Sequence, residues 1–292
     1  MQSGRLPTPN PTVLAAVVSL MLLVLLGAQP ARALPEVDTA LIVSVDVSNS
    51  VDDARYRLQM EGIAKALEDP GVISAITTGP QAAILFSIMT WADRSEMTLP
   101  WVRIASAADA KAVAARIRKL PRAKGEFTCL SKMLRNIADK VVPQIPAVAT
   151  RTVIDVSGDG RDDCNPAEPT EAVRDELVAS KVTINGLPIL DGDEAKTIED
   201  WYREHVMGGI GSFIIAANGY GDFERAIRQK FVVEISSAWP LERFPAEVVP
   251  GSAKETRQRK DLERVSDSVR TEHALGGFDS AALLPIARAY RR

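Results

Sequence analysis

The chain has 292 residues, with 35 basic and 38 acidic side chains and a hydrophobic content of 46%. This length and apolar content are sufficient for one sizeable domain with a buried core. The net charge of −3 differs from the strongly basic balance of nucleic-acid-binding proteins. It also argues against an anionic membrane surface as the main partner.

The first 33 residues have the features of a cleaved secretory signal peptide. Arg5 precedes the apolar run 13–27, and the small-x-small sequence Ala31-Arg32-Ala33 follows as a cleavage signal. The run is shorter than the ~20 residues of a transmembrane helix, so cleavage is favoured over a retained membrane anchor. Cleavage would remove two arginines and no acid, which changes the net charge from −3 to −5. We expect an exported protein, periplasmic or secreted, with no membrane span after cleavage.

Apolar runs alternate with helical patterns between residues 39 and 237. Strands are expected at residues 39–45, 82–91, 97–104, 151–157, 181–189 and 212–217. Helices are expected at residues 52–68, 107–120, 128–142, 169–180, 194–206 and 222–235. Ser50 is the expected N-cap of the first helix, and Pro100 places its strand on an edge of the sheet. The alternation predicts an α/β fold with a doubly wound, largely parallel sheet and helices on both faces.

The composition changes after Trp239. Residues 34–239 contain the whole alternation and are expected to form one domain. Residues 251–271 are strongly charged with little apolar periodicity, and residues 275–290 are apolar again. We expect residues 240–292 to be a charged, mostly flexible C-terminal tail with room for a short docking helix.

Three loops of this predicted fold offer oxygen ligands. Asp46, Ser48 and Ser50 follow the first strand, Thr128 opens a middle helix, and Asp159 lies between two glycines after a later strand. Open α/β sheets bind their ligands at the carboxyl ends of the strands. Oxygen donors of this kind suit a hard divalent cation such as Mg2+. Taken alone, the two serines could instead serve only as helix caps.

The order of these residues resembles a known metal site. Asp-x-Ser-x-Ser after the first strand, a threonine opening a middle helix and Asp-Gly after a later strand are similar to the metal-ion-dependent adhesion site (MIDAS) of von Willebrand factor A domains. The resemblance covers about residues 37–237. The segments 151–160 and 182–189 look like a bacterial exported subfamily of such domains whose function is not established.

The resemblance implies a role for each residue of the set. Ser48 and Ser50 would bind the ion through their hydroxyls, and Thr128 would bind it directly or through water. Asp46 and Asp159 would supply negative charge, partly through bridging waters. The expected ion is Mg2+, with Mn2+ or Ca2+ as alternatives. A coordination position stays open in this family, and an aspartate or glutamate of a protein partner fills it, which implies an adhesion or scaffolding module.

The chain has two cysteines, Cys129 and Cys164. In an exported protein an even number of cysteines favours a disulfide, and two unpaired thiols are the alternative. The pair is a departure from the family pattern, because Cys129 is next to Thr128 and Cys164 follows Asp159 closely. A bond between them would tie two of the three metal loops together.

Two other functions stay open at this stage. An oxygen-ligated Mg2+ after a first strand also serves phosphoryl chemistry, so a metal-assisted hydrolase such as a phosphoesterase is the enzymatic alternative. Ser48 stands where phosphatases of similar layout would have a second aspartate, and no catalytic constellation is found, so we expect a protein that is not an enzyme. The other alternative is a degenerate scaffold domain that binds no ion.

Three further aspartates need an interpretation. Asp155 lies inside an apolar strand, where an unpaired carboxylate is costly. The sequence leaves open whether it bonds a neighbouring loop or supports the metal loops. Asp162 and Asp163 are expected to be solvated loop residues.

Overall fold

The structure is a computed structural model that describes residues 34–164 and 167–236. The expected signal peptide of residues 1–33 and the expected tail of residues 240–292 therefore lie outside the described residues.

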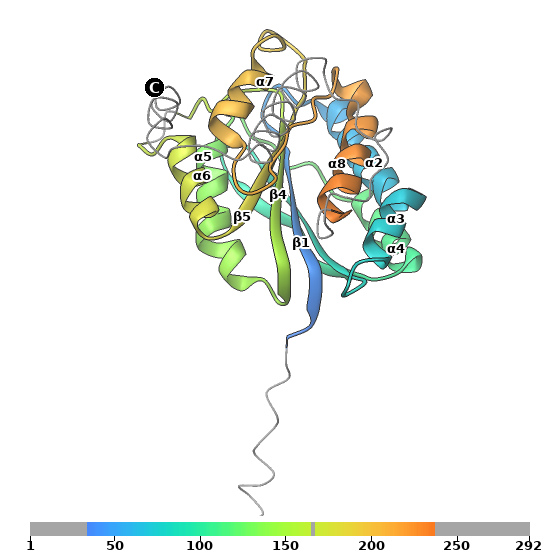
Figure 1. The fold of residues 1–292 in the computed structure, drawn as a ribbon. Helices are drawn as coiled ribbons and strands as arrows, with labels where there is room; N and C mark the ends of the chain where they lie inside the picture. Colours follow the sequence, from blue (N-terminus) through green and yellow to red (C-terminus); the bar gives the residue numbers. More distant parts are fainter. Residues whose placement is uncertain (1–33, 165–166, 237–292) are drawn as a thin grey trace, which may run out of the picture. The chain divides into compact units, whose positions relative to one another are not determined.

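A five-stranded sheet forms the centre of the described region (Figure 1). The strands are β1 (Glu36–Asp46), β2 (Ile84–Trp91), β3 (Ser95–Ile104), β4 (Val148–Gly158) and β5 (Val182–Pro188). Their order is β3-β2-β1-β4-β5, and only the edge strand β3 is antiparallel to its neighbour. Strand β1 is central, so Thr39 is paired with Ile84 on one side and with Arg151 on the other. The expected doubly wound, largely parallel α/β fold is confirmed.

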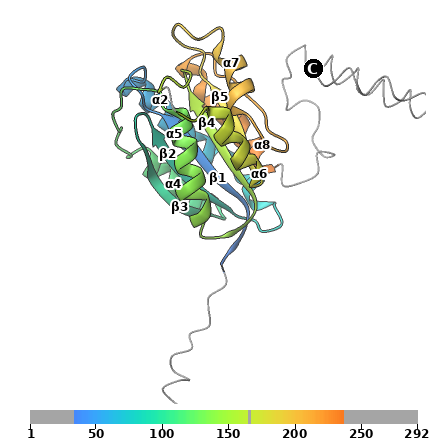
Figure 2. The same ribbon diagram turned by 90° about the vertical axis from the view of Figure 1, so that its left-hand side faces the viewer.

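Helices cover both faces of this sheet (Figures 1 and 2). One face carries α2 (Asp53–Glu68), α3 (Pro70–Thr77), α4 (Ala107–Ile117) and α8 (Phe223–Ser236). The other carries α5 (Leu130–Asn136), α6 (Thr170–Ala179) and α7 (Ile198–Trp201). Side chains of β1 alternate between the two cores, since Leu41 and Val43 face the first and Ile42 faces the second. A strand buried on both faces in this way must be apolar almost throughout.

The start of α2 differs from the prediction. Asp52, and not Ser50, is the N-cap, and its Oδ1 accepts hydrogen bonds from the backbone nitrogens of Ala54 and Arg55 at 2.9 and 2.8 Å. A carboxylate at this position satisfies two free amides and also interacts favourably with the positive helix end. The side chain of Ser50 is thereby left for another role.

The chain between residues 194 and 217 is less regular than expected. The helix begins only at Ile198 and continues from Tyr202 as the π-helix Tyr202–Val206. The expected strand at 212–217 lies beside β5 but pairs with it only through isolated bridges. The amide of Phe213 explains part of the difference, because it donates to the side-chain Oδ1 of Asn185 at 3.0 Å and not to a strand carbonyl.

Asp155, which the sequence left unassigned, forms a buried ion cluster under α8. The ammonium of Lys230 lies 3.3 Å from Asp155 Oδ1 and 3.2 Å from Glu234 Oε1. Asn185 donates to the same Glu234 oxygen at 2.8 Å, and all four side chains are buried. Burial raises the pKa of Asp155 well above its usual range, the charge of Glu234 raises it further, and Lys230 opposes both. The cluster fastens α8 to β4 and β5.

Within the described residues, we find no helix with the length and apolar character needed to cross a lipid bilayer.

Candidate metal site at the carboxyl edge of the sheet

Two neighbouring strands end at the same edge of the sheet and carry the two candidate carboxylates. Strand β1 ends with Asp46, and β4 ends one residue before Asp159. The strands are parallel and in register, with Val45 opposite Ser157. The sheet topology therefore brings both aspartates to the edge where open α/β folds bind ligands.

A chain of hydrogen bonds joins the residues of the first loop to Asp159. The Ser48 amide donates to Asp46 Oδ1 at 2.7 Å, and the hydroxyls of Ser48 and Ser50 are 3.2 Å apart. Ser50 Oγ then donates to Asp159 Oδ1 at 2.7 Å. Since Asp52 caps α2, the two serines are directed to each other and to Asp159 and do not serve as helix caps.

Thr128 lies next to the Asp159 loop. A Cβ on Gly160 would be 3.3 Å from Thr128 Oγ1, a tight contact, so the absence of a side chain at that glycine favours the close approach of the two segments. Thr128 is buried, and α5 begins two residues after it. The five side chains singled out from the sequence, Asp46, Ser48, Ser50, Thr128 and Asp159, thus come from three loops that meet at one place.

Asp46 is the least satisfied group of this set. Its side chain is 0% exposed, and its Oδ2 has no hydrogen-bond partner among the described residues. Burial raises the pKa of Asp46 to about 7, the charge of Asp159 contributes to the rise, and the Ser48 bonds oppose it. A second negative charge close to a buried carboxylate favours a proton or a cation at this point.

Two tyrosines complete the site, and sequence reasoning missed them. Tyr220 donates its hydroxyl to Asp159 Oδ2 at 2.9 Å. The hydroxyl of Tyr202 is buried without a partner among the described residues, and a Cβ on Gly158 would be 2.7 Å from it and 3.0 Å from Asp46 Oδ2. Burial and the nearby aspartates raise the pKa of both tyrosines, so both remain neutral hydroxyls. No local pattern marks either tyrosine, because both come from irregular segments late in the chain.

Arg55 of α2 forms a positive rim beside the site. Its guanidinium donates to the backbone oxygen of Ser50, pairs with Asp191 at 2.9 Å and lies 5.1 Å from the ring centre of Tyr220. The side chain is about one-third exposed, so its charge faces solvent as well as the loop. This contact holds the Ser48–Ser50 turn against Tyr220.

Asp162 and Asp163 have a structural role that the sequence analysis did not predict. Asp163 Oδ1 accepts from the Thr128 amide at 2.7 Å, and the Asp163 amide donates to the Thr128 carbonyl at 3.1 Å. Asp162 Oδ2 accepts from the Ser131 amide at 2.8 Å. Both are loop residues, Asp163 exposed and Asp162 half-buried, and their carboxylates in addition bind free amides at the start of α5.

The expected disulfide between Cys129 and Cys164 is confirmed, with a Cα–Cα distance of 5.1 Å. It joins the Thr128 segment to the loop after β4, next to the Asp163 bonds. On the chain-entropy model, closing a loop of this length stabilises the fold by about 3–4 kcal/mol.

We predict that Cys129→Ser with Cys164→Ser lowers the free energy of unfolding by about 3–4 kcal/mol, because the unfolded chain gains the freedom that the bond removes. Urea unfolding of both proteins measures the difference. Divalent-ion affinity should fall in the same variant, since Thr128 and Asp159 are held together less firmly. An affinity equal to that of the unchanged protein would contradict a role of the bond in organising the site.

The donor set is suited to a hard divalent cation. It offers two carboxylates and three hydroxyls, and one of the carboxylate oxygens, Asp46 Oδ2, is buried without a hydrogen-bond partner among the described residues. Among residues 34–164 and 167–236, no three histidine, cysteine, aspartate or glutamate side chains gather as a metal cluster. Binding at this edge would therefore depend on the hydroxyl oxygens together with the two aspartates, an all-oxygen set typical of Mg2+, Mn2+ and Ca2+.

Comparisons with known proteins agree with this fold. The family model described as "Protein of unknown function (DUF1194)" matches residues 36–239, and no curated protein matches the sequence significantly. Proximal thread matrix protein 1 from the mussel byssus is 13% identical with a TM-score of 0.52, and the match covers 69% of this chain and 48% of that one. A second structure of the mussel protein, "with zinc occupied MIDAS motif", has a TM-score of 0.51 at the same identity and coverage.

A von Willebrand factor type A structure from Catenulispora acidiphila is also 13% identical, with a TM-score of 0.47 over 69% of this chain and 43% of that one. The chain spans about half the length of the mussel protein. Identities this low bear on the fold alone, and the described residues share an α/β fold with the mussel protein.

Proposed function

The chain belongs to the family described as Protein of unknown function (DUF1194), and on that premise we propose that residues 34–239 are an exported, metal-dependent protein-binding module. In this proposal Ser48, Ser50, Thr128 and the two aspartates Asp46 and Asp159 hold a divalent cation, with Mg2+ as the first candidate and Mn2+ or Ca2+ as alternatives. An aspartate or glutamate of a protein partner completes the coordination.

One observation supports the proposal most: the buried Asp46 Oδ2 has no hydrogen-bond partner in the part of the chain that the structure describes, although the neighbouring hydroxyls and Asp159 form a linked chain beside it. A buried carboxylate without a partner costs several kcal/mol in general, and a bound cation removes that cost. The zinc-occupied MIDAS of the mussel protein adds support, because that protein shares the fold.

The chemistry of such a site favours a carboxylate partner. In this proposal the two aspartates act partly through bridging waters, so a divalent ion bound directly by neutral hydroxyls would keep part of its positive charge. Arg55 lies next to the Ser50 loop, where its guanidinium is paired with Asp191. An acidic side chain that reaches this partly dry edge would be attracted more strongly than in bulk water.

Export is proposed on two grounds. The first 33 residues fit a secretory signal, and the Cys129–Cys164 disulfide is of the kind that persists in oxidising compartments. A periplasmic or secreted location agrees with both. Residues 240–292 are proposed to be a tail that follows the binding domain.

The experiment uses the full mature chain immobilised and exposed to an envelope extract of the source organism. With Mg2+ present we expect a specific protein to be retained, and EDTA should release it because the ion bridges the two proteins. Asp159→Asn should abolish the retention, whereas Asp175→Asn, an exposed aspartate of α6 outside the metal loops, should leave it unchanged. Retention that persists in EDTA, or equally in Asp159→Asn, would contradict the proposal.

A further inference from the structure

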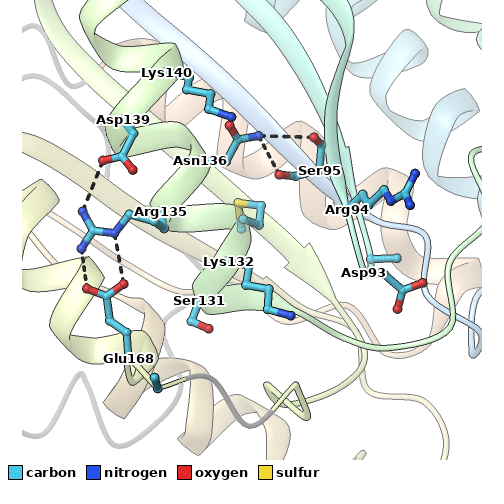
Figure 3. Close-up of a pocket in the computed structure, with 13 residues that line it drawn as sticks. Asp93, Arg94, Ser95, Ser131, Lys132, Arg135, Asn136, Asp139, Lys140 and Glu168 are labelled. Carbon is cyan, nitrogen blue, oxygen red and sulfur yellow. Dashed lines mark hydrogen bonds and ion pairs between the residues drawn. The ribbon is translucent and has the colours of Figure 1, made fainter.

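A groove of about 550 Å³ lies between the turn that joins β2 to β3 and the helix α5 (Figure 3). Asn136 of α5 lines this groove and donates a hydrogen bond to Ser95 Oγ at 2.7 Å. The volume lies in the range of ordinary ligand sites and exceeds what a single small anion needs. Its lining is unusual for such a site because it is rich in charged side chains.

Most acidic groups of the groove are already engaged. Glu168 and Asp139 both pair with Arg135, at 2.6 and 3.4 Å, as Figure 3 shows. Glu176, outside the groove, binds the same guanidinium at 2.7 Å. Asp93 accepts two backbone amides of the 126–127 segment, at 2.9 and 2.8 Å. Arg135 is therefore fully compensated, and Asp93 is the remaining acid that faces the open part of the groove.

Three basic side chains of the groove, Arg94, Lys132 and Lys140, have no ion-pair partner within the described region. Arg94 and Lys132 lie near enough to Asp93 to lower the pKa of that carboxyl, after the two backbone bonds that lower it most. The lining holds four basic and three acidic side chains. The acidic ones bind Arg135 or backbone amides, so the positive charge of the groove is carried by Arg94, Lys132 and Lys140, although the whole chain is acidic.

Ser131 provides a second, independent sign of a ligand. It lines the groove and is only 2% exposed, yet its Oγ has no hydrogen-bond partner among the described residues. A buried hydroxyl without a partner is unusual in a folded protein and is explained if a ligand supplies the acceptor. A carboxylate oxygen would accept this bond and would also pair with the neighbouring Lys132.

The groove adjoins the candidate metal site. Ser131 follows Thr128 by three residues, and its amide is held by Asp162 of the loop that carries Asp159. On the other wall, Asp93 holds the two residues before Thr128. One continuous segment, residues 126–131, therefore lies between the metal loops and the groove and belongs to both.

We propose that the groove binds an acidic segment of the protein partner, with Arg94, Lys132 and Lys140 pairing with its carboxylates and Ser131 donating a hydrogen bond. The inference rests on the proposed function, since it extends the partner's chemistry from one carboxylate on the ion to a run of acidic residues beside it. A protein partner that presents several acidic side chains in an extended stretch fits both features.

The test measures fluorescence anisotropy of a labelled oligoglutamate peptide with the mature protein, in EDTA and in Mn2+, with oligoglutamine as the neutral control. We expect oligoglutamate to bind in EDTA through the groove and more tightly in Mn2+. Lys132→Gln with Lys140→Gln should weaken binding by about three- to tenfold in both conditions, as expected for two exposed charge pairs. Ser131→Ala should weaken it by a smaller factor.

The matched control is Lys111→Gln with Lys119→Gln, which removes two exposed lysines around α4 on the opposite face of the sheet. The control variant should bind like the unchanged protein, and Mn2+ should raise the melting temperature of every lysine variant equally. Binding of an acidic segment in the groove is contradicted if oligoglutamate fails to bind in EDTA, or if both double variants bind it alike. It is also contradicted if inorganic phosphate displaces the labelled peptide as well as unlabelled oligoglutamate does. Failure of the proposed function is distinct, because Mn2+ would then change neither melting nor peptide binding.

Discussion

Replacing Lys230 by methionine is expected to lower the free energy of unfolding by about 3–5 kcal/mol at neutral pH, the usual cost of removing one partner of a buried ion pair. Lys230 is 0% exposed, and its ammonium lies between Asp155 and Glu234. Methionine has a similar length and keeps the packing, so the loss reports the two carboxyl groups left without a cation. Chemical unfolding with the linear extrapolation measures it.

The pH dependence of the stability loss in Lys230→Met distinguishes the removal of a buried cation from a packing defect. The pKa of Asp155 is already raised above its unfolded value of 3.8. Its native form therefore holds a proton that the unfolded chain releases as pH rises above about 4, and stability falls through that window. Lys230 lowers the pKa of Asp155, so without it that carboxyl binds a proton more readily still. We expect the loss in Lys230→Met to be clearly smaller at pH 5 than at pH 7.5.

Two further variants make the test specific. Adding Glu234→Gln to Lys230→Met should recover part of the stability, because one unpaired charge is removed, and the coupling should appear as non-additivity. Lys65→Met, which removes an exposed ion pair with Glu224, should leave stability close to that of the unchanged protein. A loss in Lys230→Met that is the same at both pH values would contradict the account of the cluster.

The second large effect concerns Asp46, whose replacement is expected to raise the free energy of unfolding in the absence of metal. In EDTA at pH 8, Asp46→Asn should be more stable than the unchanged protein, by up to about 4 kcal/mol. This limit follows from a pKa shift from 3.8 to about 7 at 1.36 kcal/mol per unit. Asparagine keeps the oxygen that accepts the Ser48 amide and removes the buried charge that Asp159 repels.

The raised pKa of Asp46 also determines how the stability of the unchanged protein depends on pH. Between about pH 4 and pH 7 native Asp46 retains a proton that the unfolded chain has lost, so metal-free stability should fall as pH rises through this range. The fall should be weaker in Asp46→Asn. Mg2+ should reverse the order at pH 8, because it stabilises only the chain that binds it. A metal-free Asp46→Asn that is less stable than the parent at pH 8 would contradict this assignment.

Much of the fold could be predicted because its signals are local. The run 39–45 is buried throughout and apolar except for Thr39 and Ser44, as is typical of a strand covered on both faces, and the alternation of strands and helices predicted the parallel sheet. The irregular stretch near Tyr202 and Phe213 could not be predicted in the same way. Its conformation depends on tertiary bonds, such as that from Phe213 to the Asn185 side chain, which leave no periodic pattern.

The candidate site, too, could be predicted from the sequence only in part. Asp46, Ser48 and Ser50 are close in sequence and could be grouped directly, and a known motif supplied Thr128 and Asp159. Tyr202 and Tyr220 lie near the two aspartates only because the late segments of the chain fold back over the sheet edge. The role of Lys230 was equally hidden, since a lysine in a helical pattern normally faces solvent.

The central claim is that three loops at this edge share one divalent cation. Isothermal titration of the metal-free mature protein with Mg2+ and with Mn2+ tests it most directly, with Asp159→Asn and Thr128→Val as the matched variants. We expect one ion bound per chain, with binding lost in Asp159→Asn and strongly weakened in Thr128→Val. An unchanged protein that binds neither ion, or two variants that bind as it does, would contradict the claim.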